Sequence, residues 1–283
     1  METERRQPCW SWLTRRIKLV VAYDGTDFCG WAANTGHRTV QSTLTEAVRR
    51  VSGEECEIVG ASRTDSGAHA RGQVCHFDSS VAVPAEKWAG ALNRILPVDL
   101  AVRSAQVVSK RFHSRFCAQS RCYRYRIAIG ARDPLRARYT HSHWEPLNVD
   151  AMNAAAGALV GEHDYRAYTE ELDPRIANTV RRMREVTVRA VRDEIWIDVQ
   201  GTAFLRGMMR RMAGALFEVG RGLRTAGSLA DMLTEKRTEM HLPVVLPAAG
   251  LTLMGVRYGR HPIDNRERPR LEERLENELG LME

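Results

Sequence analysis

The sequence predicts an α+β fold made of two β-α-β-β-α-β halves, which is the element order of a ferredoxin-like unit. Two observations support this prediction. Strand and helix periodicities follow one another in this order twice along the chain. In addition, 283 residues with 43% hydrophobic content are enough to bury a sizeable core. Two such units commonly pair, so we expect one extended, mostly antiparallel sheet with helices on one side and a central basic cleft.

The first half shows alternating apolar residues where strands are expected, and apolar residues three or four positions apart where helices are expected. Pro84 is well suited to the first position of a helix. The expected elements are a strand at 16–23, a helix carrying Val40, Leu44, Val48 and Val51, short strands at 56–60 and 73–78 around a glycine-rich loop at 61–72, a helix opened by Pro84, and a strand at 100–108.

The second half repeats this order, beginning with a strand in which Tyr123, Tyr125, Ile127 and Ile129 share one face. Gly220 is a typical stop signal for a helix. The expected elements are this strand at 122–129, a helix at 148–160, a hairpin of 179–191 and 194–200 turning at Arg192 and Asp193, a long helix at 203–219, a short helix begun by Ser228, and a strand at 250–258.

The organisation along the chain follows from these elements. We expect an N-terminal extension at 1–15, ferredoxin-like subdomains at 16–115 and 116–262, and an acidic helical tail at 263–283. The tail differs in kind because it holds seven acids against four arginines and places Leu271, Leu275 and Leu279 at helical spacing.

Charge indicates the kind of partner. The net charge is +7, and the interval from Arg103 to Arg138 holds ten Arg or Lys residues but a single acid, Asp133. Arginine binds phosphates bidentately, so this stretch is typical of a protein that binds a polyanion. A GC-rich genome could account for the excess of arginine over lysine, but it does not explain the missing acids.

Composition also bears on location. The six cysteines form no CxxC pair, which favours a reducing cytosol without disulfides. The first sixteen residues lack the apolar core of a secretory signal, and no apolar run is long enough for a membrane span. A cytoplasmic protein that does not bind membranes is therefore expected.

The loop at 61–72 is the first candidate for chemistry. Asp65 stands between Arg63 and a small flexible pair, with His69 four residues later. An aspartate in such a loop is usually a turn former, but a loop between two strands at a sheet surface is also a common place for function. His69, His76 and Cys75 lack a fourth ligand at a familiar zinc spacing, so a structural role is favoured over a metal site. Nucleotide-binding and serine-hydrolase signatures are missing from the sequence.

Five segments then resemble, in order, the motifs of the TruA family of pseudouridine synthases. RTDSGAHARGQVCHF is similar to the family's RTDAGVHA followed by GQVxHF, and YDGTDFCGW with RTVQSTL is similar to its opening motif and the helix after it. The other three are FHSRFCAQSRCYRYRI, FLRGMMRRMAG and PAAGLTLMGVRY. The resemblance covers residues 16 to 258. It departs from the family's usual Gln, Gly and Gly at Ala32, Ser42 and Ser62, which puts the choice of target uridine in question more than the reaction.

The resemblance implies roles for individual residues. Asp65 matches the nucleophile and Arg63 the arginine that helps hold the target nucleotide out of the stack. Tyr123 matches the tyrosine that packs on the uracil, and Arg210 the helical arginine that pairs with the aspartate. Tyr123 could instead be a core residue of its strand. Arg210 could instead bind phosphate, since Arg206 is expected on the same helical face. The remaining candidates for substrate binding are Arg121, Arg124 and Arg206.

The activity implied is isomerisation of uridine at positions 38 to 40 of the tRNA anticodon stem-loop, by a homodimer that needs no cofactor and no metal. One alternative is a pseudouridine synthase acting at another tRNA or RNA site. A second is a noncatalytic RNA-binding protein of RRM-like fold, because ferredoxin-like units also build RNA recognition modules. The sequence lacks the aromatic RNA-binding motif of such modules and keeps the four candidate catalytic residues together.

Overall fold

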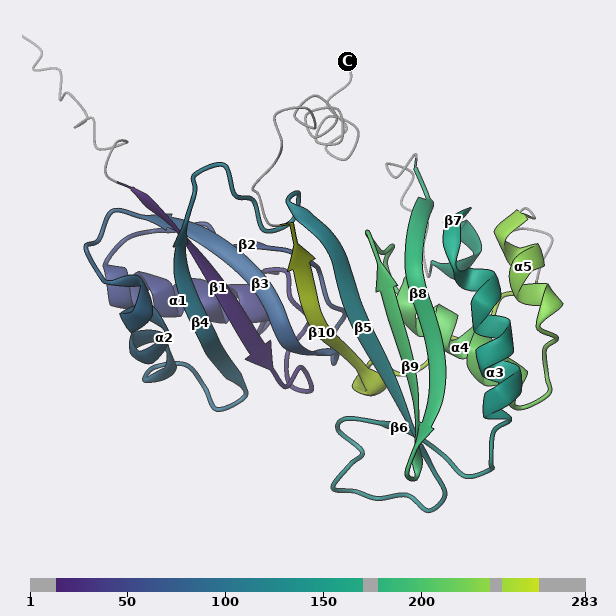
Figure 1. Cartoon of the computed structure of the whole chain (residues 1–283). Coiled ribbons are helices and arrows are strands. Elements are labelled where there is room, and N and C mark those ends of the chain that lie inside the picture. Colours follow the sequence, from purple (N-terminus) through teal and green to yellow (C-terminus); the bar gives the residue numbers. More distant parts are fainter. Residues whose placement is uncertain (1–13, 170–177, 235–240, 260–283) are drawn as a thin grey trace, which may run out of the picture.

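The computed structural model describes residues 14–169, 178–234 and 241–259 (Figure 1). These residues form an α+β fold around one ten-stranded, mostly antiparallel sheet, with helices packed against one face. The predicted fold class is confirmed. The predicted acidic tail lies outside the described residues, and the division into subdomains stays a prediction.

The first half follows the order of a ferredoxin-like unit. Its strands lie in the order β4-β1-β3, with β2 pairing the outer side of β3, and all these pairs are antiparallel. The elements are β1 (Arg15–Tyr23), α1 (Val40–Ser52), β2 (Val59–Gly60), β3 (His69–Ser79), α2 (Ala85–Asn93) and β4 (Leu100–Val108).

The second half repeats this arrangement in the order β10-β5-β9-β8, again antiparallel, and β7 adds an edge strand. The hairpin turn lies where it was predicted, and Arg192 takes a positive φ of 58° there. The elements are β5 (Ala118–Ile129), β6 (His141–His143), α3 (Val149–Ala156), β7 (Gly161–Asp164), β8 (Val180–Val191), β9 (Glu194–Gly201), α4 (Met208–Gly220), α5 (Gly227–Thr234) and β10 (Leu251–Tyr258).

The two halves join through a short parallel pairing of β3 with β10, in which Thr252 and Leu253 lie opposite His69 and Ala70. Strand β2 pairs with β3 farther along, opposite Cys75 and His76. Because β2 and β10 occupy the same edge of β3 at different levels, the loop between β2 and β3 emerges where the halves meet. The topology therefore places the candidate catalytic loop at the junction.

The core lies between the sheet and the helices. Alternate residues of each strand face it, as the period of a β-strand requires, and Tyr125 on β5 is fully buried with its hydroxyl donating to the Pro247 carbonyl at 2.7 Å. Helix α1 begins after Thr39, which forms a capping box with Ser42. One of the departures from the family pattern thus stabilises a helix.

The helix expected at 203–219 is shorter than predicted. It begins at Met208, because Gly207 takes a left-handed conformation with φ of 64° and separates the helix from the residues before it. Phe204 and Leu205 carry the apolar spacing that resembles helix, but they belong to the preceding loop. The prediction that Arg206 shares a helical face with Arg210 is therefore wrong.

Candidate active site

The loop carrying Asp65 is held by the segment that follows β1. The Tyr23 hydroxyl lies 2.8 Å from Thr64 Oγ1, and the backbone N–H of Trp31 donates to the Thr64 carbonyl at 3.1 Å. Gly30 has φ of +82°, and a Cβ there would lie 2.8 Å from the Thr64 carbonyl oxygen. Only glycine fits such an approach. The motif at 23–31 therefore holds the backbone of the Asp65 loop in place.

Asp65 faces a guanidinium from the other half. Arg210 Nη1 lies 3.5 Å from Asp65 Oδ2, across 145 residues of sequence. Arg210 is itself oriented, because its Nε donates to the Leu246 carbonyl at 2.7 Å. The side chains of Arg210 and Asp65 are 19% and 24% exposed, so the carboxylate remains reachable from solvent. The ion pair predicted from the sequence is present.

Tyr123 lies on β5 beside this pair. The residue is 5% exposed, and its ring meets the ring of Phe204 edge-on, with centroids 4.8 Å apart. Its hydroxyl lies 2.7 Å from Ser62 Oγ, three residues before Asp65. Burial raises the pKa of Tyr123 to about 12, so the phenol keeps its proton at neutral pH. An aromatic side chain thus reaches the loop that carries Asp65.

Arg63 and Arg121 differ sharply in their surroundings. Arg63 is exposed next to Asp65, where an RNA could reach it. Arg121 is 7% exposed, and its guanidinium donates to the carbonyls of Ala61 at 2.9 Å, Arg115 at 2.7 Å and Thr202 at 2.5 Å. Arg121 therefore ties the Asp65 loop to the loop before α4.

The two other candidate arginines also make contacts within the protein. Arg124 forms a bidentate ion pair with Asp198, at 2.6 and 2.9 Å, and its guanidinium lies 3.9 Å from the centre of the Trp196 ring. Arg206 is exposed in the loop before α4, and its carbonyl accepts from Thr169 Oγ1 at 2.8 Å. The structure brings Asp65, Arg210 and Tyr123 together, with Arg63 beside them, and places Arg124 away from this group on the other face of β5.

Asp24 is a residue that sequence reasoning missed. It accepts from the backbone and hydroxyl of Thr26 and from the Tyr139 hydroxyl at 2.9 Å, and Arg138 lies 3.1 Å away. Burial alone would raise the pKa of Asp24, but these hydrogen bonds together lower it to about 2. Tyr139 and Arg138 follow β5, so Asp24 links the halves. Its place within the matched motif at 23–31 was the available signal.

His69 packs next to Asp24 and has a structural environment. Its Nδ1 lies 3.0 Å from the Gly25 backbone nitrogen and 3.2 Å from Asp24 Oδ1, and its Nε2 lies 3.2 Å from the Ala249 carbonyl oxygen. Burial lowers the pKa of His69, which keeps the ring neutral. Within the described ranges, no group of three or more His, Cys, Asp or Glu side chains is arranged to hold a metal ion.

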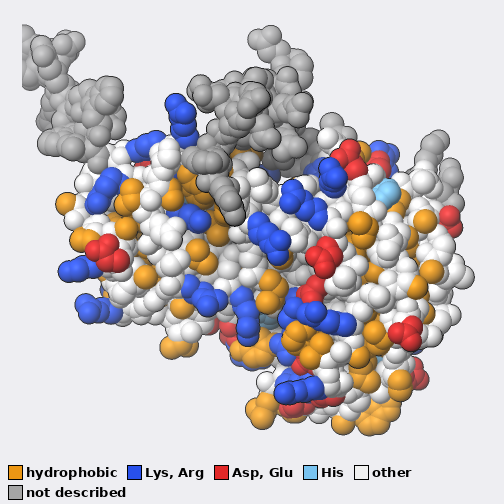
Figure 2. All heavy atoms as spheres, viewed as in Figure 1, with side chains coloured by type: hydrophobic (Ala, Val, Ile, Leu, Met, Phe, Trp, Pro, Cys, Tyr) orange, Lys and Arg blue, Asp and Glu red, His pale blue; other side chains and the backbone are white. Residues whose placement is uncertain are grey.

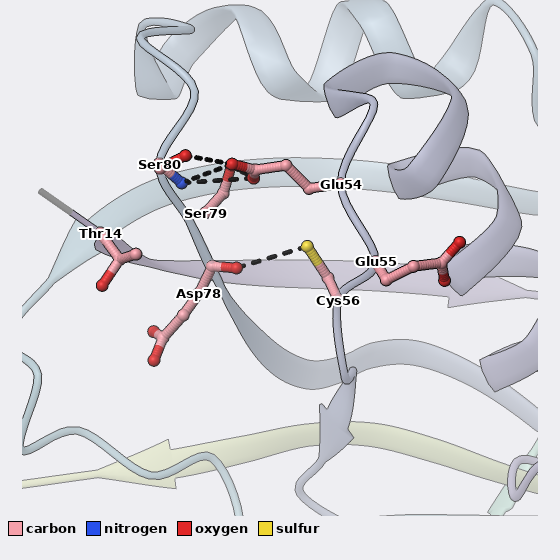
Figure 3. A pocket seen from close by; sticks show the side chains of 7 residues that line it. All are labelled: Thr14, Glu54, Glu55, Cys56, Asp78, Ser79 and Ser80. Atoms are coloured by element: carbon pink, nitrogen blue, oxygen red, sulfur yellow. Dashed lines mark hydrogen bonds between the residues drawn. The ribbon is translucent and has the colours of Figure 1, made fainter. Parts of the chain in front are cut away.

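A shallow pocket at the far end of β3 does not fit an RNA ligand. Its lining includes Glu54, Glu55 and Asp78, and Glu54 accepts from Ser79 Oγ at 2.6 Å (Figure 3). Ser79 ends the eleven-residue strand that begins beside the Asp65 loop, roughly 30 Å away at 3.3 Å per residue. The negative charges of Glu54, Glu55 and Asp78 in the pocket would repel a phosphate backbone. This pocket is separate from the candidate site.

The sheet face opposite the helices carries much of the positive charge. Figure 2 shows Lys and Arg side chains spread over this face above β3, β10 and β5. Arg71, Arg103 and Arg257 are exposed residues of β3, β4 and β10. A basic surface therefore extends across the junction of the halves.

None of the helices in the described part of the chain is long and apolar enough to cross a membrane.

The sequence model described as tRNA pseudouridine synthase matches residues 19–117 and 155–259, which is most of the chain. The chain belongs to the tRNA pseudouridine synthase family. It is 39% identical over 245 residues to the tRNA pseudouridine synthase A of Brevibacillus brevis, covering 86% of this chain and 100% of that protein.

Other relatives carry the same name. The tRNA pseudouridine synthase A of Halalkalibacterium halodurans is 37% identical, with 85% of this chain and 89% of that protein covered. That of a Nostoc species is also 37% identical, with 88% of each chain covered. The family predicted from the sequence motifs is confirmed.

Proposed function

We propose that this enzyme converts uridine to pseudouridine at positions 38 to 40 of the tRNA anticodon stem-loop, with Asp65 as the nucleophile and no cofactor. The observation that carries the proposal is the convergence of Asp65 from the first half with Arg210 and Tyr123 from the second. The family membership supports the reaction and the tRNA substrate.

The reaction requires that the N-glycosidic bond breaks, that the uracil rotates, and that C5 then bonds to C1′. C5 loses its proton and N1 gains one, so the product is an isomer of the substrate. The target base must leave the stack and stay in the pocket while it is detached. Asp65 supplies the carboxylate, by attack at C1′, attack at C6, or elimination to a glycal. The Arg210 guanidinium favours the ionised carboxylate. Tyr123 packs on the uracil, and Arg63 helps hold the target nucleotide out of the stack.

Binding of the RNA follows from the charge on the sheet face. Arg71 and Arg257 lie on the neighbouring strands β3 and β10, and Arg103 lies on β4, one strand beyond β1. These exposed arginines provide phosphate contacts along an RNA stem. Recognition of the anticodon stem-loop, and assembly into a homodimer with two such sites, are parts of the proposal that rest on the family resemblance.

The test is conversion of defined transcripts. Purified enzyme is incubated with tRNA transcripts carrying uridine at position 38, 39 or 40, and the products are mapped for pseudouridine. The proposal predicts conversion at these positions and none with Asp65→Asn. Conversion only at other positions would replace the anticodon assignment by another target site. Binding without any conversion would indicate the noncatalytic RNA-binding alternative.

A further inference from the structure

The contact between Ser62 and Tyr123 joins the catalytic loop to the strand that carries the candidate stacking ring. Ser62 Oγ and the Tyr123 hydroxyl are 2.7 Å apart, although 61 residues separate them in sequence. The loop belongs to the first half and β5 to the second. This hydrogen bond therefore crosses the junction within three residues of Asp65.

Hydrogen bonds to the backbone of Ser62 and of the preceding residue, Ala61, fix the position of Ser62. The Gln73 side chain donates to the Ser62 carbonyl at 2.6 Å, and Gln73 is fully buried. On the preceding residue, the Ala61 N–H donates to the Val74 carbonyl at 2.7 Å, and its carbonyl accepts from Arg121 at 2.9 Å. With the backbone held in this way, the Ser62 hydroxyl has a defined position.

The ring of Tyr123 depends on that hydroxyl for its orientation. Its backbone lies between β10 and β9, opposite Leu253 and Val199, so only the side-chain torsions remain free. One edge of the ring packs on Phe204 and the hydroxyl end reaches Ser62. A buried phenol without a partner is costly, so loss of the Ser62 hydroxyl favours other ring positions.

We propose that Ser62 is a positioning residue for the isomerisation, whose hydroxyl holds the Tyr123 ring in the orientation in which the ring packs on the detached uracil. This inference rests on the proposed function, since it assumes the stacking role of Tyr123. The related motif has glycine at this position. The serine side chain here adds a contact between the loop that carries Asp65 and strand β5.

The experiment compares Ser62→Ala, Tyr123→Phe, the double variant and Ser62→Thr in the full chain. The readouts are the single-turnover rate of pseudouridine formation at saturating tRNA transcript, the Kd for the transcript, and the Tm of each protein. Ser42→Ala serves as the matched control, because it removes a serine hydroxyl of the same half that is bonded to Thr39, the N-cap of α1.

The proposal predicts that Ser62→Ala lowers the single-turnover rate about 3- to 10-fold while Kd changes less than twofold, as expected for loss of one hydrogen bond in the reacting complex. The double variant should react no more slowly than Tyr123→Phe alone, and Ser62→Thr should recover part of the rate. Ser42→Ala should lower Tm and leave the rate unchanged.

Two results would overturn the inference. One is a single-turnover rate of Ser62→Ala within twofold of that of the unmodified enzyme. The other is that Ser62→Ala lowers this rate by the same factor in the unmodified enzyme and in the Tyr123→Phe variant. Failure of the proposed function is separate, because it would appear as no conversion by the unmodified enzyme. In that case, the unfolding free energies of Ser62→Ala, Tyr123→Phe and the double variant still test the hydrogen bond between the two side chains. Additive effects would count against this hydrogen bond, and coupled effects would support it.

Discussion

Arg210 on α4 and Asp65 in the β2–β3 loop form an ion pair, with 3.5 Å between Nη1 and Oδ2. The pair joins the two halves of the chain at the place where β3 and β10 meet. A pocket that closes around a flipped base excludes water, which would raise the pKa of a carboxylate and remove its charge. The proposed mechanism requires a charged Asp65 carboxylate, and the neighbouring guanidinium stabilises that charge.

Replacement of Arg210 tests this role directly. Arg210→Ala should lower the single-turnover rate at saturating tRNA by 100-fold or more, on the order of 3 kcal/mol in the barrier. Arg210→Lys should recover only part of the rate, because an ammonium cannot both pair with Asp65 and donate to the Leu246 carbonyl in the geometry of a guanidinium. If Arg210 only bound phosphate, both variants would mainly raise Kd and saturating tRNA would restore the rate.

Arg121 should act through the fold and not through RNA phosphates. Arg121→Lys removes the fixed fork of donors that reaches the carbonyls of Ala61, Arg115 and Thr202 together, which should destabilise the protein by about 2–4 kcal/mol. Urea unfolding measures this loss. The salt dependence of tRNA binding should keep its slope in a variant that remains folded. A stable Arg121→Lys protein with a flatter slope would identify Arg121 as a phosphate ligand instead.

The salt dependence itself should come from the exposed arginines. Affinity for tRNA is expected to fall with a log–log slope of about −0.7 to −0.9 per phosphate contact. Combined replacement of Arg71, Arg103 and Arg257 by Gln should flatten the slope. Arg126→Gln is the matched control, because Arg126 is bonded to Glu194 at 2.7 and 2.6 Å and should leave the slope unchanged. Equal slopes in both variants would place the RNA elsewhere.

Asp24 should make stability depend on acid. Its folded pKa of about 2 lies below the usual 3.8, so its contribution is present above pH 4 and is lost as the pH falls toward 2. Asp24→Asn should lower the unfolding free energy by about 1–2 kcal/mol at pH 7. Asp27→Asn, which removes a contact with Arg138 alone, should cost less. Urea titrations from pH 7 to pH 2.5 measure the free energy of unfolding of the unmodified protein and of Asp24→Asn. The difference between the two should narrow below pH 4, and a constant difference would contradict this role of Asp24.

Local sequence patterns predicted most of the elements but not their ends. The strand at 100–108 was located correctly because its flanks carry turn residues, whereas β3 begins at His69, inside the expected loop. The α4 boundary was misjudged because Phe204 and Leu205 are packed in a loop, and apolar spacing alone does not reveal the left-handed Gly207. The short strands β6 and β7 carry too few residues for a periodic signal.

The candidate site shows the same division between local and long-range information. Asp65 stood out because its own motif is continuous in sequence. The contact of Ser62 with Tyr123 and the carbonyl contacts of Arg121 join segments about 60 residues apart or more, where only the folded chain brings them together. The ion pair of Asp65 with Arg210 was predicted through the family resemblance, since no local pattern connects them.

The most direct test of the account is the activity of Asp65→Asn on a tRNA transcript with a target uridine in the anticodon stem-loop. The amide keeps the size of the side chain and removes its charge, so the fold, the Tm and the Kd for the transcript should be close to those of the unmodified enzyme. We predict no pseudouridine after an incubation in which the unmodified enzyme completes many turnovers. Measurable multiple-turnover formation of pseudouridine by Asp65→Asn would contradict the assignment of Asp65 as the nucleophile.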